Sequence, residues 1–382
     1  MNKNLLALAV SAAILAPSLA SADVTVYGRI QAEYNIEDSD ASGADSVQGI
    51  DDVGNQSRLG FKFKEKLGGG LTSFGKVEFH FNPSDGGNTS NASTNPTKAA
   101  ARALGNRDSH VGIKSSWGSI AAGSFHAPYK TAGGVKWDPW TATHLQARRA
   151  GGMTGGTGLG GHNGFMRNAL YYTSPNVNGF KVQFAISPDE TNTGASNGGT
   201  ADSDDGDNDY SLAVQYKNGP WHAIFAHNRN NNDSAAGDET LTKVGLRWKQ
   251  GAWTAAGQYE SVSDAASQGA VSGTTPGIAG NYRAIPGSDQ DIYWLNGQYK
   301  AGNNIFTVSY GNMDTDVSGG GDYDYTYWAA GVIHKFSKKT RIFAGYTQTD
   351  GDGDASCTAG GGMNTCNTND RDAWTVGIRK DF

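Results

Sequence analysis

Apolar and polar side chains alternate with a period of two along most of the chain, from Val24 to its last residues. The final stretch shows the pattern well. One set of alternate positions holds Trp374, Val376, Ile378, Lys380 and Phe382, and the other holds Thr375, Gly377, Arg379 and Asp381. This is the period of a β-strand whose two faces meet different surroundings. An aromatic residue at the end of such a strand favours a sheet that closes on itself, because closure leaves no unpaired edge.

The same pattern predicts sixteen strands. They lie at about 24–36, 56–66, 71–82, 107–116, 119–125, 166–174, 179–187, 209–217, 220–229, 240–250, 252–261, 290–300, 303–312, 323–336, 340–349 and 371–382. Most are long enough to cross a hydrocarbon core, which takes about 9–11 tilted residues. Alternation alone does not separate inside from outside, because a soluble sandwich could turn its polar face to water.

The connections between these strands alternate in length. Short joins with Gly, Asn or Lys lie at 66–70, 115–118, 218–219, 250–251, 301–302 and 337–339. Long polar loops lie at 37–55, 83–106, 126–165, 188–208, 230–239, 262–289, 313–322 and 350–370. Short turns at one end and long loops at the other are typical of an all-β transmembrane barrel of antiparallel strands, with periplasmic turns and extracellular loops.

Composition and the first residues agree with this fold class. Gly accounts for 54 of 382 residues, with 16 Tyr, 14 Phe and 9 Trp, which suits many strands joined by glycine-bearing turns. The mean hydropathy of −0.52 does not argue against a membrane, because alternating faces cancel in any average. Lys3, the apolar run 5–15 and Ala20-Ser-Ala22 predict a cleaved signal peptide at 1–22, followed by a single barrel domain at 23–382.

The formal charge of −6 is mild, and acids gather at 202–209 and 350–354. No basic stripe indicates a nucleic-acid partner. Cys357 and Cys366 lie in one polar loop, and in an oxidising compartment we expect a local disulfide between them.

Four motifs, taken together, resemble those of the general Gram-negative porins. They are Val24-Thr-Val-Tyr-Gly-Arg-Ile30, Asn168-Ala-Leu-Tyr-Tyr-Thr-Ser-Pro175 with Gly179-Phe180, Ser337-Lys-Lys-Thr340 before Tyr346, and Gly377-Ile-Arg-Lys-Asp-Phe382. The resemblance covers nearly all of the mature chain. It implies an outer-membrane homotrimer of sixteen-stranded barrels, a third loop folded into the lumen, and recognition of Phe382 by the barrel-assembly machinery. Lys380 departs from the family, whose strands commonly carry an aromatic residue third from the end.

The long segment 126–165 is the candidate constriction, because a loop of this length is uncommon unless it has a function. It carries Trp137, Asp138, Trp140, His144, Arg148 and Arg149, followed by a glycine-rich run. We expect it to fold inward, with an external loop as the alternative. The expected lumen-facing wall charges are Arg29, Glu33, Arg58, Lys76, Glu78 and Arg167. Bases outnumber acids near this opening, which favours anions.

No sequence feature indicates catalysis. There is no G-x-S-x-G, no H-E-x-x-H and no Cys/His metal spacing, and Gly156-Thr-Gly-Leu-Gly-Gly161 opens no predicted helix. Asp350-Gly-Asp-Gly-Asp354 has Ala355 where a calcium loop needs glycine, although weak binding of a cation that bridges lipopolysaccharide stays open. The sequence predicts a passive pore for ions and small hydrophilic solutes, without enzymatic activity, cofactor or metal, in contact with outer-membrane lipid and lipopolysaccharide. The alternatives are a solute-selective channel, with Trp137 and Trp140 as a stacking platform, and an adhesin or other β-rich surface binding protein.

Overall fold

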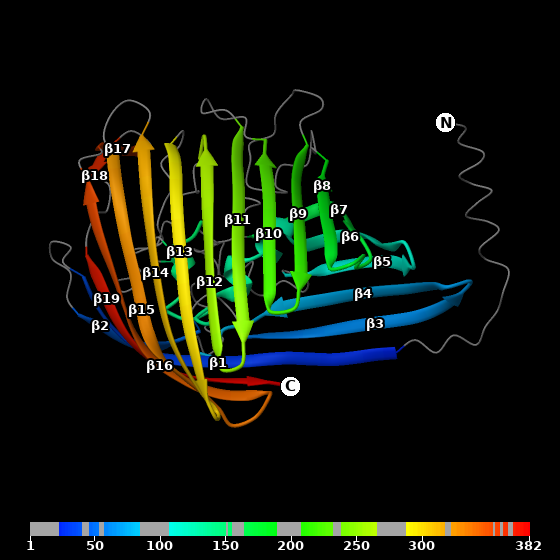
Figure 1. Ribbon diagram of the computed structural model, residues 1–382, viewed down its shortest axis with the longest axis horizontal. Helices are drawn as coiled ribbons and strands as arrows, with labels where there is room; N and C mark the ends of the chain where they lie inside the picture. The colour runs from blue at the N-terminus through cyan, green and yellow to red at the C-terminus, as the bar shows by residue number, and fades with distance from the viewer. Residues whose placement is uncertain are drawn as a thin grey trace, which may run out of the picture.

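A closed barrel of sixteen antiparallel strands and one additional short strand makes up the protein in this computed structural model (Figure 1). The structure describes residues 23–39, 46–52, 57–84, 107–149, 152–154, 164–188, 208–231, 238–265, 288–317, 322–353, 356–359, 362–365 and 370–382. In order around the barrel, the strands are β1 (Asp23–Ser39), β3 (Arg58–Gly68), β4 (Leu71–His80), β5 (Ser109–Ser115), β6 (Gly118–His126), β7 (Phe165–Thr173), β8 (Phe180–Ser187), β9 (Asp209–Asn218), β10 (Trp221–Asn230), β11 (Glu239–Gln250), β12 (Trp253–Ser263), β13 (Ser288–Ala301), β14 (Asn304–Val317), β15 (Asp322–Lys335), β16 (Thr340–Gly353) and β19 (Arg371–Asp381). All sixteen predicted strands are confirmed.

The barrel closes between β1 and β19. Their register runs from Arg29 opposite Asp381 to Ser39 opposite Arg371. Beyond β19, the backbone N–H of Phe382 donates to the carbonyl of Gly28 at 3.1 Å, and the N–H of Gly28 donates back at 3.3 Å. The prediction that the terminal strand closes the sheet is therefore confirmed.

The other edge of β1 is shared between two strands. β3 pairs with the first part of β1, up to Arg29, and β2 (Val47–Asp51) pairs with Glu33–Glu37. β2 lies in the segment 37–55, which was predicted to be a loop. β3 does not reach the part of β1 that follows Arg29, so that edge would otherwise be unpaired, and β2 covers a portion of it.

Short turns connect the strands at one end of the barrel, the turn end. Gly219, Gly251 and Gly302 adopt φ values of 53°, 57° and 58° there, a left-handed conformation that glycine reaches without strain. The opposite end, the loop end, carries the long connections. Four consecutive strands, β13 to β16, have 14 residues each. Each extends further towards the loop end than the sequence predicted.

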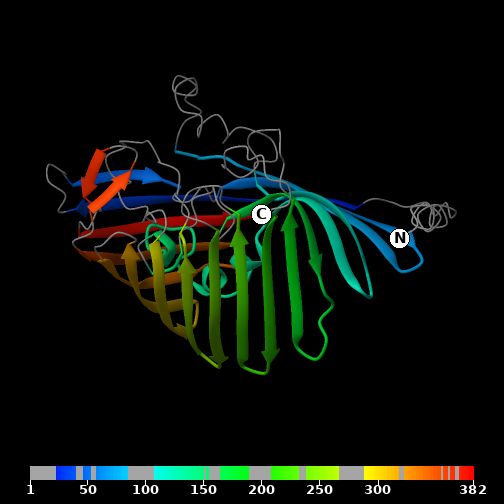
Figure 2. The same cartoon turned by 90° about the horizontal axis from the view of Figure 1, so that it is seen from above.

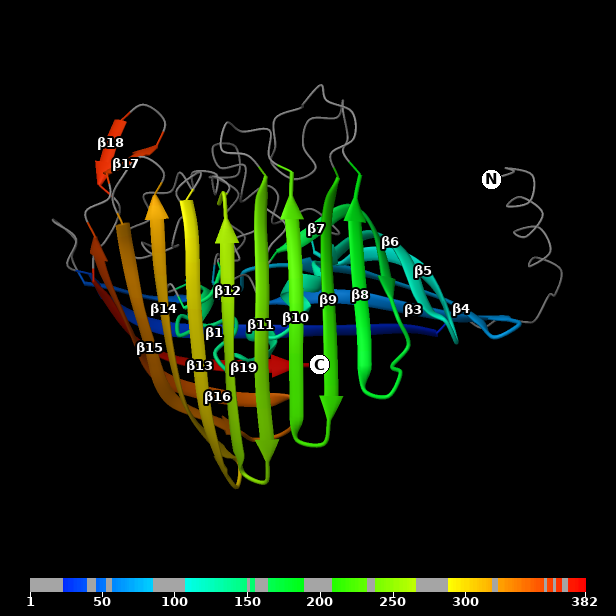
Figure 3. The same ribbon diagram turned by 45° about the horizontal axis from the view of Figure 1, so that its top comes forward.

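A separate hairpin lies at the loop end, beyond β16 and β19 (Figure 3). It consists of β17 (Ser356–Ala359) and β18 (Gly362–Thr365), within a segment predicted to be a loop. Cys357 belongs to β17, whereas Cys366 lies outside the described residues, so the disulfide between them stays a prediction. The signal peptide expected at 1–22 also lies outside the described residues.

The two faces of the sheet differ as the alternation predicted. On β19, Trp374, Val376 and Ile378 are 60%, 55% and 52% exposed and point away from the barrel. The alternate positions point inward, and many of them are buried and polar or small, such as Thr375 on β19 and Gln31 and Asn35 on β1. An apolar outer surface around a polar interior is the arrangement that a hydrocarbon environment requires. Within the described segments, no helix has the length and apolar character needed to cross a bilayer.

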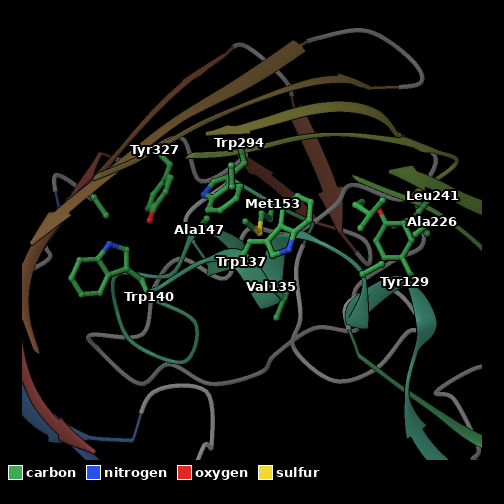
Figure 4. Packing of buried hydrophobic residues seen from close by; sticks show 14 of the residues in the cluster. Tyr129, Val135, Trp137, Trp140, Ala147, Met153, Ala226, Leu241, Trp294 and Tyr327 are labelled. Carbon is green, nitrogen blue, oxygen red and sulfur yellow. The ribbon is translucent and has the colours of Figure 1, made fainter. Parts of the chain in front are cut away.

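The third long connection enters the barrel. Its helical turns α3 (Pro128–Thr131), α4 (Gly134–Trp137) and η2 (Ala147–Arg149) lie between the green-to-gold wall and the blue and red strands (Figure 2). Trp137, Trp140 and Met153 pack there near Trp294 of β13 and Tyr327 of β15 (Figure 4). The prediction that this loop folds inward is confirmed. Its short helices were not predicted.

Candidate functional site

The inward-folded loop, residues 127–154, is held to one side of the barrel by β11 and β12. The buried Lys243 donates from Nζ to the carbonyl of Tyr129 at 2.8 Å and lies 3.9 Å from the centroid of the Tyr129 ring. Tyr129 donates its hydroxyl to Glu260 at 2.7 Å. The backbone N–H of Gly134 donates to Gln258 at 2.6 Å. Each bond is formed between groups withdrawn from bulk water, where losing a partner leaves a costly unsatisfied polar atom.

The other side of the loop reaches β1 and β15. The amide of Gln31 donates to the carbonyl of Ala142, and the backbone N–H of His144 donates to Glu33 at 3.1 Å. Tyr327 donates its hydroxyl to the carbonyl of Leu145 at 2.5 Å. The loop therefore crosses the lumen and narrows it. Glu33, one of the predicted wall charges, is buried beneath the loop as one of its anchors.

Asp138 stabilises the loop from within. Its carboxylate accepts hydrogen bonds from the backbone N–H of Trp140 at 2.9 Å and of Ala147 at 3.1 Å. Burial raises the pKa of Asp138 to about 7, although both hydrogen bonds act in the opposite direction. The predicted lumen charge at this position thus faces the backbone of its own loop.

A cluster of charges on β3, β4 and the start of β5 faces the lumen, with Glu78 at its centre. Arg107 approaches Glu78 at 2.6 Å, Lys76 at 3.2 Å and Arg58 at 3.5 Å. Tyr27 donates its hydroxyl to the same carboxylate at 2.8 Å. Three bases therefore share one acid whose side chain is only 2% exposed.

Asp108 is the second acid of this cluster. It pairs with Lys76, and its carboxylate lies 2.8 Å from Nδ1 of His126. The sequence had not singled out Arg107 or Asp108. Both lie in the predicted strand 107–116, just before the observed start of β5 at Ser109, and strand parity alone would have put Arg107 on the same outer face as Val111 and Ile113.

A second group of charges lies at the junction of β1, β19 and β16. Arg29 pairs with Asp381 at 2.6 Å, and Arg379 pairs with the same aspartate at 3.3 Å. Arg341 stands opposite Arg379 in the register of β16 and β19. Arg29 was predicted to be near Arg58. The two are opposite each other where β1 pairs with β3, which links both groups along one wall.

The loop contributes bases of its own, Lys130, Lys136 and Arg148. Burial, together with repulsion from Arg148, Arg107 and Lys136, holds the pKa of Lys130 well below its usual range. Lys136 is exposed to the lumen, yet the surrounding protein excludes part of its water and lowers its pKa; Asp108 opposes this, while Arg58, Arg148 and Lys76 add to it. Lys130 and Lys136 were not singled out from the sequence, because nothing in it shows that short helices turn them towards the wall.

Arg149 and Arg167 are the two remaining arginines of the predicted set. Arg149 is the last residue of η2, and its side chain is outside the described part of the structure. Arg167 is exposed on β7, where the register with β6 shifts by a bulge between Gly123 and Phe125. The bulge interrupts the alternation on which its predicted inward direction depended.

The indoles of Trp137 and Trp140 are buried. Trp137 is 4% exposed, with the ring of His222 at 5.2 Å and the guanidinium of Arg247 at 5.6 Å. Trp140 is fully buried. Neither indole presents an open face to the lumen, so the two do not form a stacking platform for a solute.

A closed barrel with an apolar outer surface, whose own loop narrows a charged lumen, belongs to the class of membrane-spanning channels. A family model for the Gram-negative porins matches residues 7–354 of the chain. The chain therefore belongs to the Gram-negative porin family. It is an outer-membrane protein that forms a pore for diffusion.

Individual proteins resemble this chain over nearly its whole length. It is 27% identical over 380 residues to a major outer membrane protein P.IB of Neisseria gonorrhoeae, with 91% of this chain and 94% of that protein covered. A P.IB of Neisseria lactamica is 26% identical over 397 residues, with full coverage of both chains. Among solved structures, an anion-selective porin from Comamonas acidovorans superposes with a TM-score of 0.70 at 22% identity, covering 95% of this chain and all of the other. A Salmonella typhi OmpF complex with daunomycin superposes with a TM-score of 0.64 at 14% identity, covering 94% and 97%.

Proposed function

We propose that this pore passes small anions in preference to cations. The observation that carries the proposal is the convergence of bases from two sides of the narrowed lumen. Lys136 of the loop lies close enough to Arg58 and Lys76 of the wall, and to Arg148 of its own loop, for their charges to repel one another. Like charges held this close raise the local electrostatic potential, and a permeating anion lowers it.

The acids of the site do not balance these bases. Glu78 is buried and shared by three bases, and Asp108 is engaged by Lys76 and His126. Asp138 is occupied by backbone groups of the loop. An ion in transit therefore meets mainly ammonium and guanidinium groups.

The proposal extends to the assembly and its surroundings. The working form would be a homotrimer in the outer membrane, in contact with lipopolysaccharide, inserted by the barrel-assembly machinery after removal of residues 1–22. It would act by passive diffusion, without enzymatic activity. Two solved structures with this fold support it, the anion-selective porin from Comamonas acidovorans and an OmpT of Vibrio cholerae in trimer form.

A salt gradient across a planar bilayer tests the selectivity. With unequal KCl concentrations on the two sides, the wild-type pore should give a reversal potential of anionic sign. Lys136→Glu should lower the chloride-to-potassium permeability ratio by about fivefold or more, because a unit charge a few ångströms from a permeating ion is worth about 1 kcal/mol even in water.

Lys338→Glu is the matched control, since Lys338 is an exposed lysine in the turn between β15 and β16. It should leave the permeability ratio nearly unchanged. A wild-type reversal potential of cationic sign would refute the proposal. An equal effect of both substitutions would assign the selectivity to charge at the mouth of the pore.

A further inference from the structure

The outer surface of the barrel carries a groove that pore function does not explain. It has a volume of about 470 Å³ and runs across the outward face of β14, β15, β16, β19, β1 and β2. Its outward-facing lining residues are Ala32, Tyr34, Ile50, Asn304, Val332, His334, Ile342, Ala344, Val376 and Ile378.

The register explains why the surface is hollow there. In one row across the strands, Tyr34, Val376, Ala344 and Val332 stand side by side. In the next row towards the turn end, Ala32 stands beside Ile378 and Ile342. Ala344 and Ala32 have only a Cβ atom, so the larger neighbours form walls around a low floor. The shape and apolar lining suit hydrocarbon chains.

The turn end of the groove is polar and basic. Lys380 lies one row beyond Ile378 on the same outward face, and its Nζ donates to the hydroxyl of Thr340 at 2.9 Å. Among the residues that the structure describes, Lys380 has no acidic partner. His334 donates from Nδ1 to the side-chain oxygen of Asn304 at 2.7 Å. Lys339, in the adjoining turn, adds a second ammonium group.

We propose that the groove is a binding site for a phospholipid with an anionic headgroup, drawn from the periplasmic leaflet. The acyl chains would fill the groove, and the phosphate would pair with Lys380. The turn end is the periplasmic end of the barrel, which places the ammonium group at the headgroup level of that leaflet. A second protomer that covered the groove with apolar side chains would leave Lys380 without a counter-charge, which is unfavourable in a membrane.

Retention of lipid by the purified full-length protein tests this site. The protein is equilibrated in mixed micelles with equal amounts of dioleoyl phosphatidylglycerol and dioleoyl phosphatidylethanolamine, and bound lipid is counted by native mass spectrometry. The wild type should retain phosphatidylglycerol in preference. Lys380→Gln should lower that preference about fivefold, the value of one lysine near an anionic headgroup. Ala344→Phe, which fills the groove, should lower retention of both lipids.

Two controls match these variants. Lys66→Gln removes an exposed lysine at the turn end of β3, and Ala255→Phe adds a ring to the outward face of β12. Neither should change lipid retention. Equal retention of both lipids by the wild type, or an unchanged preference in Lys380→Gln, would overturn the proposal. Dissociation of the oligomer by Ala344→Phe without a change in retained lipid would instead show that the groove is a contact between copies.

Discussion

At the scale of single residues, some of the many glycines lie within the sheet, opposite aromatic residues, and not in turns. The register places Tyr27 opposite Gly60, Phe63 opposite Gly75, and Phe343 opposite Gly377. In each pair the aromatic ring covers the glycine; a Cβ atom added at Gly75 would lie 2.0 Å from Cζ of Phe63 and 2.7 Å from the carbonyl oxygen of His110. Rings that cover glycines on neighbouring strands pin the register of a curved sheet.

Gly75→Ala should therefore destabilise the barrel by about 1–3 kcal/mol, the usual cost of forcing atoms into a filled space. Gly297→Ala is the matched control, because its added Cβ atom would meet nothing nearer than Cγ1 of Val308 at 3.7 Å. Guanidinium unfolding in detergent, followed by tryptophan fluorescence, compares the two. Equal stability of both variants would contradict the role given to the Phe63 ring.

At the scale of the element, the inward-folded loop depends on a carboxyl group that titrates near neutral pH. We call the loop seated when it is hydrogen-bonded to the barrel wall, and unseated when it is released. In the unseated loop, the pKa of Asp138 should return to its ordinary value of about 4. Between about pH 4 and pH 7, the Asp138 carboxyl is therefore mostly protonated when the loop is seated and mostly ionised when the loop is unseated. The free energy of seating therefore falls as the pH rises from about 4 to about 7, and it changes little above pH 7.

Between pH 5.5 and pH 8, the free energy of seating should fall by about 2 kcal/mol. Current fluctuations of a single open pore should accordingly grow over this range in the wild type. In Asp138→Asn, which cannot ionise, they should stay at their low-pH level throughout. Retention of the wild-type pH dependence in that variant would assign it to another group.

Prediction from sequence succeeds or fails at this same scale for physical reasons. All sixteen barrel strands were predicted, because a long strand shows a clear period of two in its apolar and polar residues. β2 was missed because its five residues are too short for a clear period and gain stability only from the upper edge of β1. Arg107 and Lys130 were missed because their direction depends on partners far away in the sequence, whereas Arg58 and Lys76 followed from strand parity alone.

At the scale of the whole molecule, charge is distributed unevenly along the lumen. Inward positions near the turn end carry Lys64, Lys114, Lys181, Lys217, Lys249, Lys300 and Lys335. Inward positions towards the loop end carry Glu33, Glu37, Asp209, Glu239 and Glu260. The lumen therefore has a fixed gradient of potential from one mouth to the other, which acts on every permeating ion.

Such a gradient should make the current of pores inserted in one orientation differ in size at opposite voltages in 0.1 M KCl. The asymmetry should disappear in 1 M KCl, where the Debye length falls to about 3 Å. Lys249→Gln combined with Lys335→Gln should reduce it at low salt. A symmetric current at low salt would show that the loop, and not this gradient, dominates the resistance.

The pairing of β1 with β19 also has a consequence for how the protein folds. Arg29 and Asp381, which meet at that seam, are 352 positions apart, whereas most other strands pair with a neighbour in sequence. Hairpins between neighbouring strands can form early. The seam forms more slowly, because bringing β1 and β19 together costs the chain between them conformational entropy before any contact across the seam stabilises the barrel. Until then, the unpaired edges of β1 and β19 are open to any other extended chain. The period of greatest risk of aggregation is thus the interval before a single pair of strands meets.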